Sequence, residues 1–75
     1  MSRVGRHAEA ERLLSGIIAT DPGDVTAHVN LGLVYEAQGR DREAEAEYRR
    51  ALALQPDEPN ALAGLERLGR ASEKR

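Results

Sequence analysis

The side chains that could perform chemistry in this 75-residue sequence are few and far apart. Cysteine is absent, so there is no thiolate to act as a nucleophile or a metal ligand. The two histidines, His7 and His28, do not form the His-x-x-x-His pair that places two imidazoles on one helix face. Ser15 lies in a helical pattern without a base at catalytic spacing. We therefore predict that the protein is not an enzyme and uses no metal or cofactor.

Acidic residues cluster between positions 41 and 47 but do not predict a carboxylate site. They alternate along the sequence, and a helix with about 3.6 residues per turn spreads such residues over different faces. Glu45 instead stands four residues before Arg49, which is the spacing of a surface ion pair worth about 0.3 kcal/mol. The glycines are dispersed and do not form a phosphate-binding loop after a strand. The sequence thus lacks the usual sites for acid–base catalysis and phosphate binding.

Composition excludes two further classes of protein. Hydrophobic residues make up 40% and charged residues 32% of the chain, which is too apolar for a disordered protein and too charged for a membrane span. The polar residues 1–12 contain no hydrophobic signal region, and the absence of cysteine fits a reducing compartment. We therefore expect a single domain over residues 1–75 that is cytoplasmic and contacts no membrane.

Net charge argues against nucleic acid as the main partner. The chain carries a net charge of −2, so it has no overall positive field to hold phosphates. A basic C-terminal group is the feature in favour, and it comprises Arg67, Arg70, Lys74 and Arg75. A nucleic-acid-binding regulator stays open as an alternative, although the middle of the chain is acidic and offers no aromatic platform for stacking bases.

An internal repeat with a period of 34 residues organises the sequence. When residues 5–24 are laid over residues 39–58, apolar residues keep the spacing i, i+4, i+7 and i+8, which is one face of an α-helix. Proline cannot continue a helix, and glycine tolerates the positive φ of a turn, so both residue types mark helix ends. They recur with the same period, at Gly5, Gly39, Pro22 and Pro56. The repeat therefore predicts helices separated by short turns.

The period predicts an all-α fold with four helices and no strand. We expect the helices at residues 7–20, 25–38, 42–54 and 59–71, followed by a frayed tail at 72–75. The short connections require neighbouring helices to run antiparallel. Asp24 and Asp41 are candidate N-caps, and Pro59 suits the first turn of the last helix.

Residues 25–58 resemble one complete tetratricopeptide repeat. The signature positions of that family are occupied by His28, Leu31, Gly32, Tyr35, Ala44, Tyr48, Ala51 and Pro56. His28 departs from the pattern, because tryptophan is favoured there, and we expect this histidine to pack in the core. Residues 5–24 resemble the second helix of a preceding repeat, and residues 59–71 resemble the first helix of a following one. The resemblance implies antiparallel helical hairpins of the tetratricopeptide type, which form a fragment of an α–α superhelix.

Small residues have structural consequences in this pattern. Gly32 and Ala44 lie where the two helices of one repeat are expected to cross, because a larger side chain would push the helices apart. Gly64 and Gly69 are expected to weaken the last helix by about 1 kcal/mol each relative to alanine.

The resemblance also implies a non-enzymatic protein–protein interaction module, a scaffold that binds a peptide segment or a partner helix. In the family, the first helices of the repeats line a concave groove. The basic clamp that chaperone-binding members use for a C-terminal carboxylate is not evident, because Val29 and Leu33 occupy places where polar residues are expected. Carried over by position, the groove residues are Thr26, Val29, Asn30, Leu33, Glu36, Ala37, Asn60, Ala63, Gly64, Arg67 and Arg70.

Self-assembly is an alternative function. The helix at residues 7–20 has no preceding first helix in this sequence, so its apolar face is expected to be open. Leu13, Leu14 and Ile17 are the candidates for contact with a second copy. A homodimer with two-fold symmetry is the usual form of such a homo-oligomer. The two functions are compatible with each other.

Overall fold

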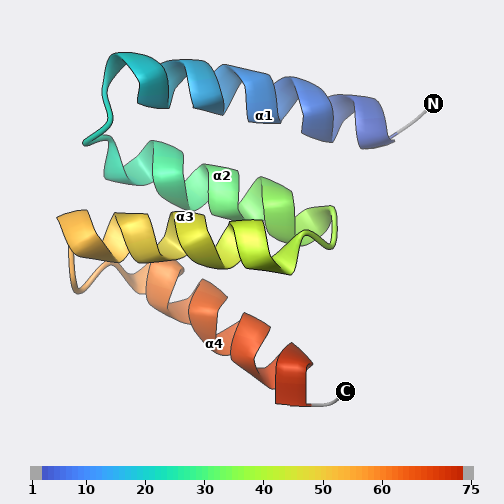
Figure 1. Cartoon of the computed structure of the whole chain (residues 1–75), viewed down its shortest axis with the longest axis vertical. Helices are drawn as coiled ribbons and strands as arrows, with labels where there is room; N and C mark the ends of the chain where they lie inside the picture. The colour runs from blue at the N-terminus through green and yellow to red at the C-terminus, as the bar shows by residue number, and fades with distance from the viewer. Residues whose placement is uncertain (1–2, 74–75) are drawn as a thin grey trace.

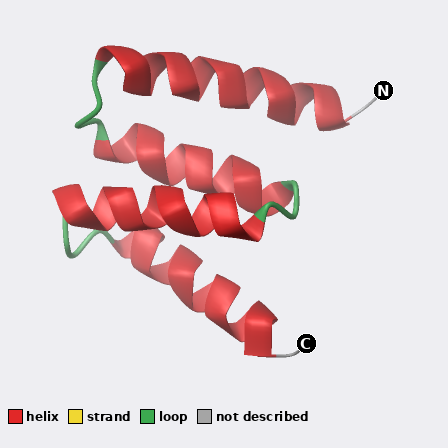
Figure 2. Cartoon of the chain, viewed as in Figure 1, coloured by secondary structure: helices red, strands yellow, loops and turns green. Residues whose placement is uncertain are grey.

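The structure, a computed structural model, describes the backbone of residues 3–73 and the side chains of residues 6–71. The described residues form helices without strands (Figure 2). The helices are α1 (Arg3–Thr20), α2 (Val25–Ala37), α3 (Asp41–Leu54) and α4 (Pro59–Glu73). The all-α fold of tetratricopeptide type with four helices is thus confirmed.

The helices form a flat, zigzag arrangement. Consecutive helices run antiparallel, and the chain measures 35 × 33 × 16 Å along its principal axes (Figure 1). α3 packs against α2 and α4, and α2 also contacts both α1 and α4. α1 packs against α2 alone among the described helices. One side of α1 therefore contacts no other helix of residues 3–73.

Side-chain caps and one glycine turn set the helix boundaries. The Asp24 carboxylate accepts a hydrogen bond from the Ala27 N–H at 3.0 Å, which confirms Asp24 as the N-cap of α2. Gly39 has a φ of +76°, a conformation that glycine adopts without strain, and it reverses the chain between α2 and α3. The Glu58 carboxylate accepts from the Ala61 N–H at 2.7 Å and so caps the start of α4. Glu58 as a cap was not predicted.

Two helix starts differ from the sequence prediction. α1 begins at Arg3, so Gly5 lies inside the helix and does not mark a turn. A glycine inside a helix costs only about 1 kcal/mol relative to alanine, which a continuous helix tolerates. Asp41 is the first residue of α3 and not its N-cap. The N-cap is Arg40, whose side chain makes no capping hydrogen bond.

The helix ends differ by smaller amounts. α2 ends at Ala37, one residue before the predicted end, because the reversal at Gly39 starts there. α4 continues to Glu73, so the first two residues of the expected frayed tail are helical. Residues 74–75 lie outside the described residues.

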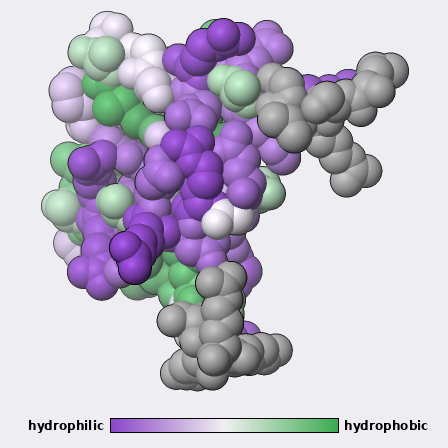
Figure 3. Space-filling model, turned by 45° about the vertical axis from the view of Figure 1, so that its right-hand side comes forward, coloured by the Kyte–Doolittle hydropathy of each residue, from purple (hydrophilic) through white to green (hydrophobic). Residues whose placement is uncertain are grey.

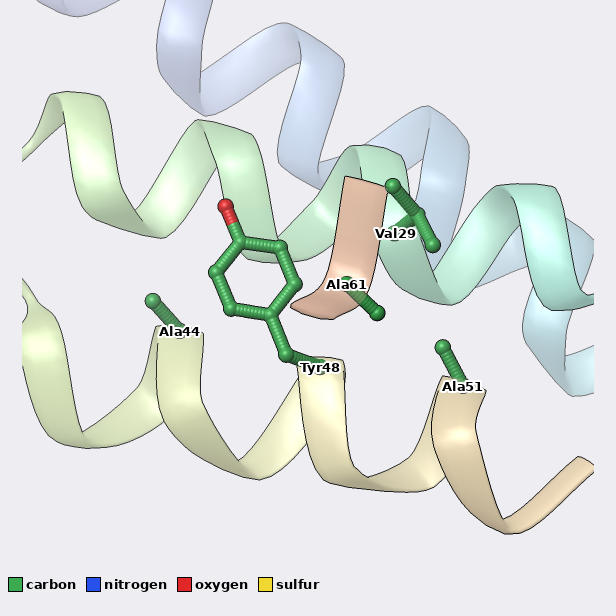
Figure 4. Close-up of a cluster of buried hydrophobic side chains, with 5 residues drawn as sticks. All are labelled: Val29, Ala44, Tyr48, Ala51 and Ala61. Carbon is green, nitrogen blue, oxygen red and sulfur yellow. The ribbon is translucent and has the colours of Figure 1, made fainter. Parts of the chain in front are cut away.

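Tyr48 occupies the centre of the core. Its ring points from α3 towards α2, between Ala44 and Ala51 on its own helix (Figure 4). The side chain is 0% exposed, and a Cβ atom added at either Gly32 or Gly64 would come closer than 3.0 Å to several ring atoms. Gly32 was expected to allow this close approach, but Gly64 was not. The buried cluster consists of Val29, Ala44, Tyr48, Ala51 and Ala61.

The described residues contain no helix that is both long enough and apolar enough to cross a membrane.

Candidate protein-interaction surface

A charged network joins the two helices that resemble first helices of repeats. Arg67 on α4 donates from Nε to Oε2 of Glu36 on α2 at 2.9 Å, and from Nη2 to Oε1 at 3.0 Å. The Tyr48 hydroxyl donates to the same Glu36 Oε1 at 2.7 Å. The Arg67 hydrogen bonds hold the pKa of Glu36 below its usual value. Burial, followed by the Glu36 carboxylate, raises the pKa of Tyr48, so its hydroxyl stays protonated and donates. This network fixes α4 beside α2.

Four α2 side chains form an exposed stripe beside this network. They occur at the spacing i, i+4, i+7 and i+11, which keeps them on one helix face. The stripe consists of Thr26, Asn30, Leu33 and Ala37. Leu33 remains 42% exposed, although it is a large apolar side chain. The stripe therefore has an apolar centre with a polar amide one turn away.

α4 contributes a second stripe at the spacing i, i+3, i+7 and i+10. It consists of Asn60, Ala63, Arg67 and Arg70, of which Ala63 is half-buried and the others are exposed. We call the two stripes together the groove surface. Because Arg67 contacts Glu36 three residues beyond Leu33, the two stripes border the same side of the molecule. The molecular surface mixes hydrophilic and hydrophobic areas and does not show a continuous apolar belt in the view of Figure 3.

Two of the predicted groove residues are buried and do not lie on the groove surface, and a third is engaged within the chain. Val29 is only 4% exposed and belongs to the core cluster around Tyr48, so the prediction that it lines the groove is wrong. Its position one turn from Val25 directs it inwards between α2 and α3. Gly64 is buried against the Tyr48 ring. Glu36 is half-buried, and its carboxylate is already engaged by Arg67 and Tyr48.

Two of the three self-association candidates on α1 are exposed side chains. Leu13 is 64% and Ile17 45% exposed, whereas Leu14 is half-buried. The residues 34 positions later, Glu47 and Ala51, are both buried on α3. The difference arises because α3 has a helix on each side, and α1 has only α2.

The sequence did not reveal a buried polar pair between α2 and α3. Nδ1 of His28 lies 2.8 Å from Oε1 of Glu47, and Nε2 lies 2.9 Å from the carbonyl oxygen of Pro22. Both ring nitrogens lie within hydrogen-bond distance of an oxygen, so the imidazole is held from two sides. Arg50 donates to the second Glu47 oxygen at 2.6 Å. The expectation that His28 packs in the core is confirmed. A polar side chain at a signature position that is usually apolar needs a buried hydrogen-bond partner, and this could have indicated that a residue such as Glu47 lies beside it.

Arg67 and Arg70 of the basic C-terminal group are engaged within the chain. Arg67 pairs with Glu36, and Arg70 donates to Glu66 at 2.5 Å. The predicted surface pair of Glu45 and Arg49 also forms, at 2.6 Å. Lys74 and Arg75 lie outside the described residues. Within the described residues, the positive charges of the basic C-terminal group are thus each offset by a glutamate, which weakens the case for nucleic-acid binding.

Potential metal ligands are dispersed over the described residues. No group of three or more histidine, aspartate and glutamate side chains in this part of the chain is placed to hold a metal ion. His28 lies within hydrogen-bond distance of the Glu47 carboxylate and the Pro22 carbonyl oxygen inside the core. Its arrangement is that of a structural residue.

Known proteins share the repeat. The tetratricopeptide repeat family model matches residues 3–68. A protein O-mannosyl-transferase of Caenorhabditis elegans is 41% identical over 54 residues, which are 72% of this chain and 8% of that protein. Cellulose synthase operon protein C of Pseudomonas fluorescens is 36% identical over 63 residues, which are 84% of this chain and 5% of that protein. No solved structure matches the chain. Because the family model covers most of the sequence and the helices pack as the repeat requires, the chain belongs to the tetratricopeptide repeat family.

Proposed function

We propose that the chain binds a peptide segment or a partner helix of another protein on the groove surface of α2 and α4. Membership of the family supports a role in protein–protein interaction. The observation that carries the finer proposal is Leu33, which is left 42% exposed at the centre of the α2 stripe. An apolar side chain surrounded by polar groups is the typical arrangement of an interface, in which a polar rim encloses an apolar centre.

The polar residues around Leu33 suit the recognition of a peptide backbone. Asn30 lies one turn before Leu33, and its amide both donates and accepts, so it matches a peptide N–H and C=O. The bidentate contact between Arg67 and Glu36 holds the two helices together before any partner arrives. A preorganised surface loses less conformational entropy on binding. These features support docking of an extended segment or an amphipathic helix.

A random peptide library displayed on phage tests this proposal, with the chain as bait. The matched variants are Leu33→Glu and Leu54→Glu, because the two leucines are exposed to a similar degree, 42% and 47%. Leu54 borders a shallow cavity with Ile18 and Ala53, away from the groove surface. We expect enriched peptides to bind Leu54→Glu as they bind the unmodified chain, and to bind Leu33→Glu at least about tenfold more weakly. Undiminished binding to Leu33→Glu would exclude the groove surface.

Self-assembly through α1 is a second candidate function, supported by the exposure of Leu13 and Ile17. Light scattering during size-exclusion chromatography, over a range of concentrations, measures the mass directly. We expect a concentration-dependent rise in mass that the double variant Leu13→Glu/Ile17→Glu abolishes. A constant monomer mass at every concentration would remove this candidate and leave the groove proposal intact.

We also propose that the segment itself is not catalytic. Its histidine at a family signature position is used in the core pair of His28 with Glu47. The names of the two relatives refer to mannosyl transfer and to a cellulose synthase operon, and this chain corresponds to 8% and 5% of their lengths. In a protein of that kind, a segment such as this one would supply a contact to a partner. The cytoplasmic location and the extent of the domain stay predictions.

A further inference from the structure

The internal repeat provides a direct comparison between two pairs of helices. With the 34-residue offset, α1 and α2 correspond to α3 and α4. In the first pair, Tyr35 on α2 is half-buried, and its ring packs against the core cluster while its hydroxyl reaches α1. Its hydroxyl donates to Glu11 on α1 at 3.4 Å, and the Arg40 guanidinium lies 4.5 Å from the ring centroid. The first pair therefore shows how a tyrosine ring is held in this repeat.

In the second pair, the position that corresponds to Tyr35 carries no aromatic side chain. Gly69 on α4 stands 34 residues after Tyr35, and a Cβ atom added there meets nothing within 4 Å. A cavity of about 550 Å³ occupies this position, where α4 diverges from α3 towards its C-terminal end (Figure 1). Its lining residues come from both helices and are Asp41, Arg42, Glu45, Arg49, Leu65, Leu68 and Gly69.

The walls of this cavity combine a carboxylate at the position that corresponds to Glu11 with an apolar surface. Glu45 stands 34 residues after Glu11, so a carboxylate acceptor is present at the corresponding point. Leu65 and Leu68 supply an apolar wall, and both pack against the core cluster. Arg42 and Arg49 on α3 also line the cavity and supply guanidinium groups beside it, whereas the residue that corresponds to Arg40, Lys74, lies outside the described residues. The cavity thus offers a carboxylate and an apolar wall beside the position that corresponds to Tyr35.

We propose that this cavity binds a tyrosine side chain of a partner protein. The ring lies against Leu65 and Leu68, and the phenol hydroxyl donates to the Glu45 carboxylate. Glu45 already accepts from Arg49 at 2.6 Å through Oε2, and a carboxylate has acceptor positions for a further donor. The arginines attract the electron-rich ring face. Phenylalanine lacks the hydroxyl and leaves Glu45 without this bond, so the cavity prefers tyrosine.

The site is distinct from the groove surface. Gly69 is two residues from Arg67, which corresponds to about 200° around the helix axis. The groove surface and the cavity therefore lie on different faces of α4. A partner that presents a tyrosine can contact the cavity whether or not another segment occupies the groove surface, so this proposal goes beyond the proposed function and does not depend on it.

Titration with N-acetyltyrosinamide, followed by amide chemical shifts, tests the proposal, and N-acetylphenylalaninamide is the matched probe without the hydroxyl. We expect saturable shifts confined to residues 41–49 and 65–71, at least about threefold weaker binding of the phenylalanine probe, and a similar weakening of the tyrosine probe in Glu45→Gln. Equal binding of both probes, shifts located elsewhere, or no saturation up to the solubility limit would overturn the proposal.

A variant that fills the cavity provides an independent check. Gly69→Tyr places a ring where Tyr35 has one in the first pair, so we expect it to reduce binding of N-acetyltyrosinamide by at least about tenfold. Gly16→Tyr is the matched control, because Gly16 on α1 also has nothing within 4 Å of an added Cβ and lies far along the chain from the cavity. Unchanged binding in Gly69→Tyr, with the fold verified by circular dichroism, would contradict the proposed site. A loss of binding in Gly16→Tyr equal to that in Gly69→Tyr would also contradict it.

Discussion

The same substitution at two glycines of α4 is expected to have opposite effects on stability. Gly64→Ala and Gly69→Ala both replace a helical glycine by alanine, and they lie five residues apart in one helix. The surroundings differ, because a Cβ atom at Gly64 would come closer than 3.0 Å to three atoms of the Tyr48 ring. At Gly69 it would meet nothing within 4 Å. The comparison therefore isolates the packing of Tyr48 from helix propensity.

The expected magnitudes follow from these two environments. At Gly69 only helix propensity acts, so alanine should raise the free energy of unfolding by about 1 kcal/mol. At Gly64 the same gain is opposed by overpacking, which costs about 1–3 kcal/mol. The cost should lie near the upper end, because the Tyr48 side chain is 0% exposed and Glu36 holds its hydroxyl at 2.7 Å. We expect Gly64→Ala to lower the free energy of unfolding by about 1–2 kcal/mol.

Urea denaturation followed by far-ultraviolet circular dichroism measures both variants. For a chain of this size, each kcal/mol corresponds to a shift of about 4–8 °C in Tm, so thermal melts should separate the two variants clearly. We expect Gly69→Ala to melt above and Gly64→Ala below the unmodified chain. If Gly64→Ala were as stabilising as Gly69→Ala, the close contact between Tyr48 and the α4 backbone would be refuted.

Three further predictions concern the polar contacts. His28→Ala should lower the free energy of unfolding in urea by about 1–3 kcal/mol, because Oε1 of the buried Glu47 loses its partner while Arg50 keeps Oε2; an unchanged urea midpoint would contradict this. Arg67 lowers the pKa of Glu36 in the folded state. The stabilisation that this carboxylate adds to the free energy of unfolding is therefore complete above its unfolded pKa and is lost as pH falls below about 4. Urea midpoints measured from neutral to acidic pH should therefore fall less steeply in Glu36→Gln, and equal slopes would argue against the pair. Asp24→Ala should cost about 1 kcal/mol by thermal melting through loss of the α2 cap, and an unchanged Tm would show that the cap is dispensable.

The repeat pattern predicts most of the fold, because apolar spacing directly determines which helix faces are buried. The apolar face of residues 42–54 identified Tyr48 and Ala51 as core residues, and both are fully buried. Gly39 was recognised as a turn because its positive φ is a local property. Gly5 was misjudged for the opposite reason, since a glycine marks a helix end only where the chain must also reverse. The sequence around Gly5 contains no such requirement.

The candidate site was predicted less completely, because it depends on contacts between distant residues. Val29 was assigned to the groove from its helix position, but the packing of α3 against α2 buries it. Glu47 was one of several alternating acids expected on different helix faces, and only the folded structure brings it to His28 across 19 residues of sequence. The role of Gly64 likewise depends on how closely α4 approaches Tyr48. The sequence around one residue does not determine its distance to residues on another helix.

The most direct test of the central claim, that α2 and α4 form the partner-binding surface, is an amide chemical-shift map of the chain with a peptide enriched by phage display. We predict that the largest shifts fall on the α2 stripe around Leu33 and on the α4 stripe from Asn60 to Arg70. They should be absent when the same peptide is added to Leu33→Glu and retained in Leu54→Glu. A map in which the largest shifts fall on α1, or on the face of α3 that carries Leu54, would contradict the claim.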